Sequence, residues 1–93
     1  MEKDLKKMQC PLVSVILPCY NSQRFIRQTL ESVVSQKYDN LEIIIVDDGS
    51  TDETDQTVNP YCADPRVKYI SQENKGLSAA RNRGMKTSNG GYI

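Results

Sequence analysis

An apolar run that leads directly into acidic and turn-forming residues constrains the fold of this chain most. Leu41–Val46 reads Leu-Glu-Ile-Ile-Ile-Val, and Asp47–Asp52 follows it as Asp-Asp-Gly-Ser-Thr-Asp. A short, β-branched and nearly continuous apolar run is typical of an interior strand of a parallel sheet, covered on both faces. We therefore expect helices on both sides of a sheet, with a polar loop at the end of this strand.

The segment before that run predicts one strand and one helix. Leu12–Leu17 is short and apolar, and we expect Pro18 to stop the strand. Ser22 is a suitable N-cap for an amphipathic helix that runs to about Gln36. Its inward face is expected to hold Phe25, Ile26, Thr29, Leu30, Val33 and Val34.

The segment after the run repeats the alternation. Ser50–Glu53 matches a capping box, so a helix is expected to begin at about Ser50 and to end early at Pro60. Val67–Ile70 predicts a third strand, and a helix is expected over residues 77–86. The last two residues, Tyr92 and Ile93, have the pattern of a fourth strand. The inward residues of the last helix are expected to be Leu77, Ala80 and Met85.

Strands that alternate with helices predict an α/β fold, a Rossmann-like three-layer sandwich with a mainly parallel sheet. The 93 residues allow one small domain, preceded by a polar leader over residues 1–10 without the apolar segment of a secretory signal. The 12 Lys and Arg balance the 12 Asp and Glu, which argues against binding nucleic acid through a basic face. No apolar run approaches the ~20 residues of a membrane-spanning helix.

The chain contains no histidine, which excludes Ser-His-Asp triads, Cys-His dyads and histidine-containing zinc sites. Its cysteines, Cys10, Cys19 and Cys62, form no Cys-x-x-Cys pair, and we expect reduced thiols. Any chemistry must therefore rest on carboxylates, hydroxyls, backbone groups, lysine and arginine.

Ligands of parallel sheets bind at the carboxyl ends of the strands, where this chain has three polar clusters. They are Pro18–Asn21, Asp47–Asp52 and Ser71–Gly76. A tyrosine ring can stack on a base, carboxylates and amide oxygens can accept from base N–H or ribose groups, and Lys75 and Arg81 can meet a phosphate. Strand-end loops are polar in any α/β protein, so a nucleotide site and a purely structural edge both remain open at this point.

Neighbouring residues that leave a strand point in opposite directions, so Asp47 and Asp48 cannot both face one ligand. We expect one to bind and the other to hold the turn or cap the next helix, with Gly49 supplying a positive φ. Binding of NAD is not favoured, because a Gly-x-Gly-x-x-Gly loop is missing after the first strand.

Several segments together resemble the beginning of a family-two glycosyltransferase. They are Val13–Asn21, Leu30–Gln36, Leu41–Asp52 and Glu73–Gly84, followed by Gly91–Ile93. Single motifs of this kind are weak, but four in this order and spacing are specific, and the resemblance covers about residues 11 to 93. It implies the GT-A fold, here truncated after about three β-α units, and a nucleotide-diphosphate sugar as donor.

The resemblance also implies roles for individual residues. Asp48 would be the carboxylate that contacts the base, Asp47 would be more structural, and Cys19 stands at a position that is usually small and is interpreted as packing. No catalytic or metal-ligating residue is assigned. The nucleotide-sugar-binding residues implied are Pro18, Tyr20, Asn21, Asp47, Asp48, Lys75, Gly76 and Arg81.

In the family, an acidic Asp-x-Asp motif that holds Mg²⁺ or Mn²⁺ follows the strand that begins Gly-Tyr-Ile, and this sequence stops at Ile93. The catalytic base and the acceptor site also lie further along. We therefore expect a fragment that is inactive alone. Its parent would be an inverting, metal-dependent enzyme that transfers sugar, most plausibly from a UDP-sugar, to a carbohydrate or lipid-linked acceptor.

The resemblance places such a parent in polysaccharide biosynthesis, in the cytoplasm, with the inner face of the membrane as a candidate location. The alternative is a non-catalytic nucleotide-binding or assembly module that is complete at this length. A truncated sheet edge would also expose apolar surface, which predicts self-association.

Overall fold

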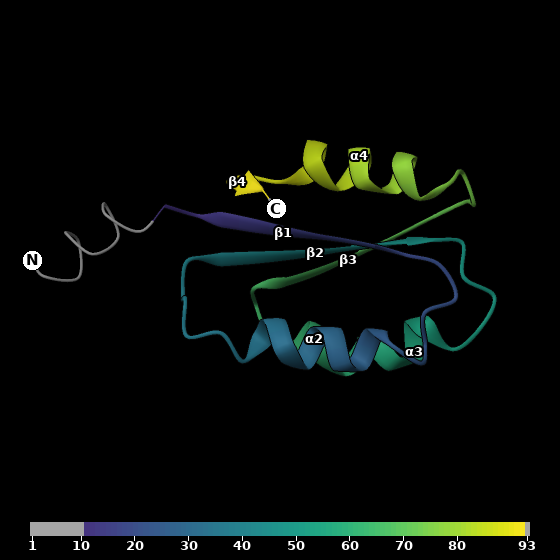
Figure 1. Ribbon diagram of the computed structural model, residues 1–93, viewed down its shortest axis with the longest axis horizontal. Helices are drawn as coiled ribbons and strands as arrows, with labels where there is room; N and C mark the ends of the chain where they lie inside the picture. Colours follow the sequence, from purple (N-terminus) through teal and green to yellow (C-terminus); the bar gives the residue numbers. More distant parts are fainter. Residues whose placement is uncertain (1–10, 93) are drawn as a thin grey trace, which may run out of the picture.

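The computed structural model describes residues 11–92 as a four-stranded parallel sheet between helices (Figure 1). The sheet order is β3-β2-β1-β4, with β1 (Val13–Cys19), β2 (Leu41–Asp48), β3 (Val67–Gln72) and β4 (Gly91–Tyr92). The helices are α2 (Ile26–Val34), α3 (Thr54–Val58), the 3-10 helix η1 (Asn59–Ala63) and α4 (Leu77–Thr87). The predicted α/β three-layer sandwich is confirmed. The expected leader, Cys10 and Ile93 lie outside the described residues.

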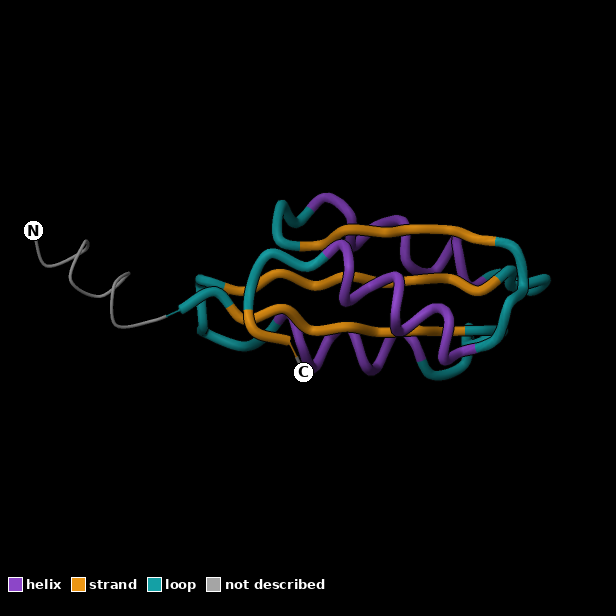
Figure 2. The backbone as a smooth tube through the Cα atoms, turned by 90° about the horizontal axis from the view of Figure 1, so that it is seen from above, coloured by secondary structure: helices purple, strands orange, loops and turns teal. Residues whose placement is uncertain are grey.

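The central strand β2 is buried along its whole length, as its apolar sequence predicts. Its odd-numbered side chains, such as Ile43 and Ile45, pack toward α2 and α3, and its even-numbered side chains, such as Ile44 and Val46, pack toward α4. Figure 2 looks onto the sheet and shows the strands side by side, with helices crossing in front of and behind them. The two apolar clusters therefore fix both faces of the sheet and hold its carboxyl edge in place.

The strand β1 does not stop at Pro18, as expected, but continues to Cys19. The N–H of Val13 donates to the carbonyl of Asn40, so the odd-numbered backbone groups of β1 point toward β2. The even-numbered ones point toward β4, as the bond from the Gly91 N–H to the Leu12 carbonyl shows. Pro18 is even-numbered, so its missing N–H costs no bond in the β1–β2 ladder.

The helix α2 begins at Ile26 with Phe25 as its N-cap, three residues after the expected N-cap Ser22, and ends at Val34 rather than Gln36. Ser22 instead opens a turn, in which its carbonyl accepts from the N–H groups of Phe25 and Ile26. Ile26 and Leu30 are buried as predicted, and Val33 and Val34 are half-buried. The prediction is wrong for Thr29, which is exposed, and for Phe25, which is 68% exposed. Phe25 precedes the helix and does not share its inward face.

The expected start of the second helix at Ser50 is also wrong, because α3 begins at Thr54. Its α-helical part ends at Val58, just before Pro60, as predicted.

The helix α4 occupies the expected segment and packs on the opposite face of the sheet from α2 and α3 (Figure 1). Ala80 is fully buried and Met85 half-buried, but Leu77 is 51% exposed and the prediction for it is wrong. Gly84 is the second buried residue of the helix. A Cβ there would lie 2.4 Å from Ile16 Cγ2, so glycine lets α4 approach β1 closely.

Candidate functional site

The loops after β1, β2 and β3 meet at the carboxyl edge of the sheet (Figures 1 and 2). Cys19 pairs in register with Asp47, and Asp48 pairs with Gln72, so the loops start side by side. All of the predicted binding residues except Arg81 lie at strand ends or in these loops, and Arg81 lies in α4, four residues after its first residue, Leu77.

Asp48 lies at the centre of this edge and is 1% exposed. Its Oδ1 accepts from Gln72 Nε2 at 2.9 Å and from the N–H of Lys75 at 2.8 Å, and its Oδ2 accepts from the N–H of Gly76 at 2.8 Å. The bond from Gln72, with those from the two N–H groups, lowers the pKa of Asp48 despite burial. A carboxylate has about four acceptor positions, so this charged group keeps capacity for one more donor.

Asp47 points to the opposite face, as predicted for adjacent strand residues. It is 3% exposed. Its Oδ2 accepts from the Tyr69 hydroxyl at 2.5 Å, and its Oδ1 accepts from the N–H of Ser50 at 2.9 Å. Gly49 turns the chain with the predicted positive φ, 75°. The geometry of Asp47 is that of a residue that holds the turn after β2.

The loops after β1 and β2 are joined by reciprocal hydrogen bonds between backbone and side chains. Backbone N–H groups of the first loop donate to side chains of the second: Asn21 to Ser50 Oγ (2.9 Å), Ser22 to Thr54 Oγ1 (2.9 Å) and Gln23 to Asp52 Oδ2 (3.3 Å). In the other direction, Thr51 and Asp52 donate to Asn21 Oδ1 (2.7 and 3.3 Å), and Glu53 donates to Gln23 Oε1 (2.8 Å).

The partners of the two serine hydroxyls explain why both predicted N-caps are wrong. Ser50 Oγ accepts from the N–H of Asn21 in the opposite loop, and the Ser22 hydroxyl donates to the carbonyl of Tyr20 in its own loop. At the start of α3 the N–H of Thr54 donates instead to Asp52 Oδ1 at 3.0 Å. Asn21 adopts a left-handed φ of 49° that lets its Oδ1 reach two consecutive N–H groups. Its acceptor oxygen therefore organises the loops.

An aromatic ring and two cations are among the side chains that face solvent here. Tyr20 is 42% exposed, and Lys75 and Arg81 are exposed as well. Pro18 is half-buried at the end of β1. Within residues 11–92, Arg81 forms no hydrogen bond or ion pair with the other predicted site residues. The edge thus combines the buried, charged carboxylate of Asp48 with an exposed ring and exposed cations.

Cys19 lies beneath these loops and is 4% exposed. Burial, with the nearby charges of Asp47 and Asp52, raises the pKa of its thiol to about 12. A thiol that stays protonated is a poor nucleophile, which agrees with the interpretation of Cys19 as a packing residue.

The sequence profile described as glycosyl transferase family 2 matches residues 14–93. The chain belongs to this family. It is 44% identical over 82 residues to the glycosyltransferase GlyA of Streptococcus pneumoniae, covering 87% of this chain and 12% of that protein. It is 45% identical over 87 residues to the putative glycosyltransferase EpsH of Bacillus subtilis, covering 92% of this chain and 25% of that protein. The chain thus spans a quarter or less of these two relatives.

Solved glycosyltransferase structures share the fold. The UDP complex of TarS from S. aureus superposes with a TM-score of 0.80 at 32% identity, covering 88% of this chain and 26% of that one. The mannosyltransferase PcManGT from Pyrobaculum calidifontis, in complex with GDP-Man and Mn²⁺, superposes with a TM-score of 0.78 at 31% identity. That match covers 86% of this chain and 25% of that one. These neighbours confirm the predicted GT-A fold.

In this family-two glycosyltransferase chain, a third buried carboxylate, besides Asp47 and Asp48, was not anticipated from the sequence. Glu42, at the opposite end of β2 from Asp48, is 6% exposed and accepts from Ser14 Oγ at 2.7 Å and from Lys68 Nζ at 2.6 Å. It also accepts from the backbone N–H of Asn89 at 2.9 Å. The sequence did contain a signal for this buried carboxylate. Glu42 is the one acidic residue inside the apolar run Leu41–Val46, and it pairs in register with Ser14.

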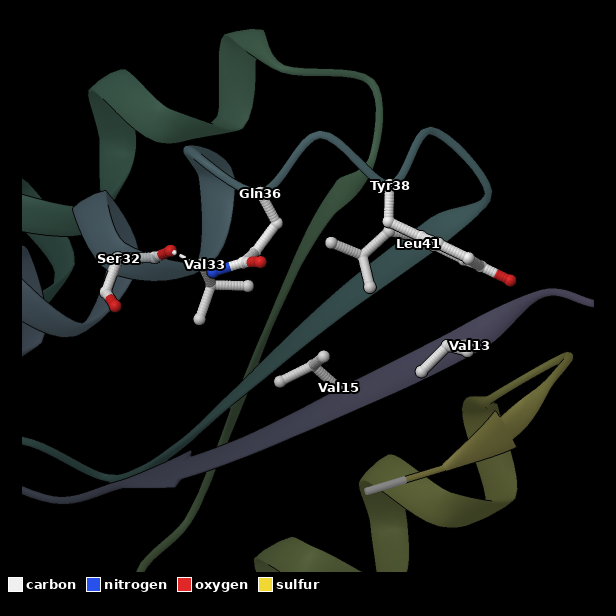
Figure 3. A pocket seen from close by; sticks show the side chains of 7 residues that line it. All are labelled: Val13, Val15, Ser32, Val33, Gln36, Tyr38 and Leu41. Atoms are coloured by element: carbon white, nitrogen blue, oxygen red, sulfur yellow. Dashed lines mark hydrogen bonds between the residues drawn. The ribbon is translucent and has the colours of Figure 1, made fainter. Parts of the chain in front are cut away.

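A pocket of about 320 Å³ lies between α2 and the amino ends of β1 and β2, away from the polar edge (Figure 3). Val13, Val15 and Val33 point toward it, and none of its lining residues is charged. None of the predicted nucleotide-binding residues lines it.

Among residues 11–92, no group of three or more cysteine, aspartate or glutamate side chains is placed to hold a metal ion. The described residues therefore do not fit a metal centre, and we assign no reaction step to one. Within the same range, no helix is both long and apolar enough to cross a membrane.

Proposed function

We propose that this chain binds the nucleotide of a nucleotide-diphosphate sugar and forms the donor-binding part of a glycosyltransferase. The observation that carries the proposal is Asp48, a buried and charged carboxylate with one acceptor position left, at the edge where Tyr20 is exposed. Family membership supports the enzyme over the alternative of a non-catalytic assembly module.

In the proposed complex, Asp48 accepts from a base N–H and the Tyr20 ring packs against the nucleoside. Lys75 and Arg81 are exposed cations that attract the diphosphate. The remaining predicted residues position these groups: Pro18 at the end of β1, Asn21 and Asp47 through the loops, and Gly76 through its N–H to Asp48.

A single free acceptor position favours a base with a single ring N–H, so we propose uracil and hence a UDP-sugar. Guanine presents a ring N–H together with an amino group, so both donors would be satisfied only by two acceptor positions. The UDP-bound TarS structure supports this choice, whereas the GDP-Man complex of PcManGT shows that the fold also accepts guanine in that protein.

For the longer enzyme we propose inverting transfer to a carbohydrate or lipid-linked acceptor, supported by Mg²⁺ or Mn²⁺, on the cytoplasmic face of the membrane. The Mn²⁺ in the PcManGT complex supports metal use in the family. We propose that the 93-residue chain alone binds nucleotide without transferring sugar. Detectable sugar transfer by the isolated chain would contradict that part.

Calorimetric titration with UDP tests the binding proposal, with NAD as the comparison ligand. Base–aromatic stacking is worth about 1–3 kcal/mol, so Tyr20→Ala should weaken UDP binding about five- to 100-fold. Its matched control is Phe25→Ala, which removes another exposed ring, at 68% exposure, from the same loop.

A second pair of variants tests the carboxylate. Asp48→Asn should weaken UDP binding about tenfold or more, whereas Glu42→Gln changes a buried carboxylate at the far end of β2 and should leave it nearly unchanged. Circular dichroism would verify that each variant is folded. Equal affinity of wild type, Tyr20→Ala and Asp48→Asn for UDP would show that the site is wrongly placed.

We also propose that the isolated chain self-associates through its exposed apolar surface. Phe25 and Leu77 are 68% and 51% exposed, and the apolar pocket of Figure 3 is open on the α2 side of β1. Sedimentation velocity at increasing concentration should show a growing fraction of dimer or larger species. A single monomeric species throughout would exclude this proposal.

A further inference from the structure

We propose that Tyr69 is a positioning residue of the nucleotide site and acts on it through Asp47. The inference rests on the proposed nucleotide-binding function. Tyr69 lies in β3 and belongs to none of the loops at the site. Its hydroxyl donates to the buried Asp47 carboxylate, which in turn holds the turn after β2.

A continuous series of hydrogen bonds leads from Tyr69 to the first loop. The Tyr69 hydroxyl donates to Asp47 Oδ2 at 2.5 Å, and Asp47 Oδ1 accepts from the N–H of Ser50 at 2.9 Å. Ser50 Oγ accepts from the N–H of Asn21 at 2.9 Å, and Asn21 directly follows Tyr20. The orientation of one carboxylate therefore connects β3 to the residue beside the proposed base-stacking ring.

Asp47 has little freedom to replace a lost partner. It is 3% exposed, and each of its oxygens accepts from one donor on a different segment, Oδ2 from β3 and Oδ1 from the turn. Removing the tyrosine hydroxyl leaves a buried oxygen without that donor, which favours rotation of the carboxylate toward other partners. Rotation would release the N–H of Ser50 and loosen the loops that Ser50 joins.

The hydroxyl is suited to a fixed donor role. Burial, together with the hydrogen bond and negative charge of Asp47, raises the pKa of Tyr69 well above its ordinary value. The hydroxyl therefore keeps its proton and donates at any physiological pH. Its ring packs against the apolar cluster under α2 and α3, so a phenylalanine would keep the packing and lose only the donor.

The test compares Tyr69→Phe with a matched control in the same chain. Tyr61→Phe removes another half-buried tyrosine hydroxyl that donates to a carboxylate, Glu31, at 2.5 Å. Tyr61 lies in η1 and its partner in α2, away from the strand-end loops. The readouts are the backbone amide NMR signals of the ligand-free protein and the affinity for UDP.

We expect Tyr69→Phe to shift the amide signals of Ser50, Thr51, Asp52 and Asn21 and to weaken UDP binding about three- to tenfold. Tyr61→Phe should leave both the loop amide signals and the UDP affinity unchanged, although it can lower thermal stability as much as Tyr69→Phe does. Unshifted loop amides in Tyr69→Phe, or an equal loss of affinity in the two variants, would overturn the proposal. Should wild type fail to bind UDP, the proposed function fails, while the amide signals alone still decide whether Tyr69 positions the loops.

Discussion

Glu42 makes the free energy of unfolding of this chain strongly dependent on pH in the acidic range. Burial alone would raise the pKa of Glu42, but the hydrogen bonds from Lys68, Asn89 and Ser14 outweigh burial and lower it from an ordinary value of 4.5 to about 2. Each pKa unit corresponds to about 1.4 kcal/mol, so ionised Glu42 stabilises the fold by about 3 kcal/mol at neutral pH. Lys68 is 45% exposed, and solvent screening of its charge brings the expected value nearer 2 kcal/mol.

The direction of the pH dependence follows from the lowered pKa. The stabilisation is fully present above pH 4.5, where Glu42 is ionised in both the folded and the unfolded chain. It declines as the pH falls from about 4.5 toward about 2, because the unfolded chain then takes up a proton that the folded chain does not. Glutamine at position 42 does not titrate, so Glu42→Gln removes this contribution to the pH dependence of stability.

Urea unfolding followed by circular dichroism at several pH values measures the effect. The free energy of unfolding of wild type should exceed that of Glu42→Gln by about 2 kcal/mol at pH 7, and by less than half as much at about pH 3. The exposed Glu73→Gln should stay within about 0.5 kcal/mol of wild type at pH 7. A difference between wild type and Glu42→Gln that is the same at every pH would refute the reasoning.

Further predictions concern packing, backbone strain and thiol reactivity. Gly84→Ala should destabilise the fold by about 1–3 kcal/mol in urea unfolding, because its Cβ would lie 2.4 Å from Ile16 Cγ2, whereas Gly91→Ala, with nothing within 4 Å, serves as the control. Asn21→Ala should lower the free energy of unfolding by about 2 kcal/mol and Asn21→Gly by about 1 kcal/mol. Both variants remove the acceptor for two N–H groups, but only alanine is strained at a φ of 49°. Equal losses of stability in the two variants would contradict this reasoning. In a Cys10→Ser background, a thiol reagent at pH 8 should modify the exposed Cys62 rapidly and Cys19 only upon unfolding, and rapid loss of both thiols would count against the raised pKa of Cys19.

The strands of the fold were predictable because burial on both faces leaves a local mark in the sequence. Leu41–Val46 is apolar for that reason, and its position in the interior of the sheet is confirmed. The polar clusters at the carboxyl edge were predictable for a similar reason, since parallel strands bring their ends together. The opposite orientation of Asp47 and Asp48 follows from the pleat alone and is confirmed.

The helix starts were mispredicted because the hydroxyls of the expected capping serines bond to other groups. Capping rules relate a side chain to the N–H groups two or three residues later, and Ser22 and Ser50 satisfy those rules in sequence. In the structure Ser50 Oγ accepts from the N–H of Asn21, 29 positions away, and the Ser22 hydroxyl donates to the carbonyl of Tyr20 while its N–H donates to Thr54 Oγ1, 32 positions away. A pairing of this kind depends on which strand ends become neighbours, so it can be derived only after the sheet order is known.

Two of the three buried carboxylates of β2, Glu42 and Asp48, bond to the backbone on either side of α4 and so add to the apolar packing that holds this helix on the sheet. Glu42 and Asp48 lie on the same face, six residues or about 20 Å apart along an extended strand. Asp48 accepts from the N–H groups of Lys75 and Gly76, just before α4, and Glu42 accepts from that of Asn89, just after it. The 11 residues of α4 rise about 16 Å at 1.5 Å per helical residue, and the non-helical residues on either side, out to Gly76 and Asn89, cover the remaining few ångströms. The helix length therefore matches the spacing of the carboxylates, and the proposed base-contacting residue is also one of the two attachment points of α4.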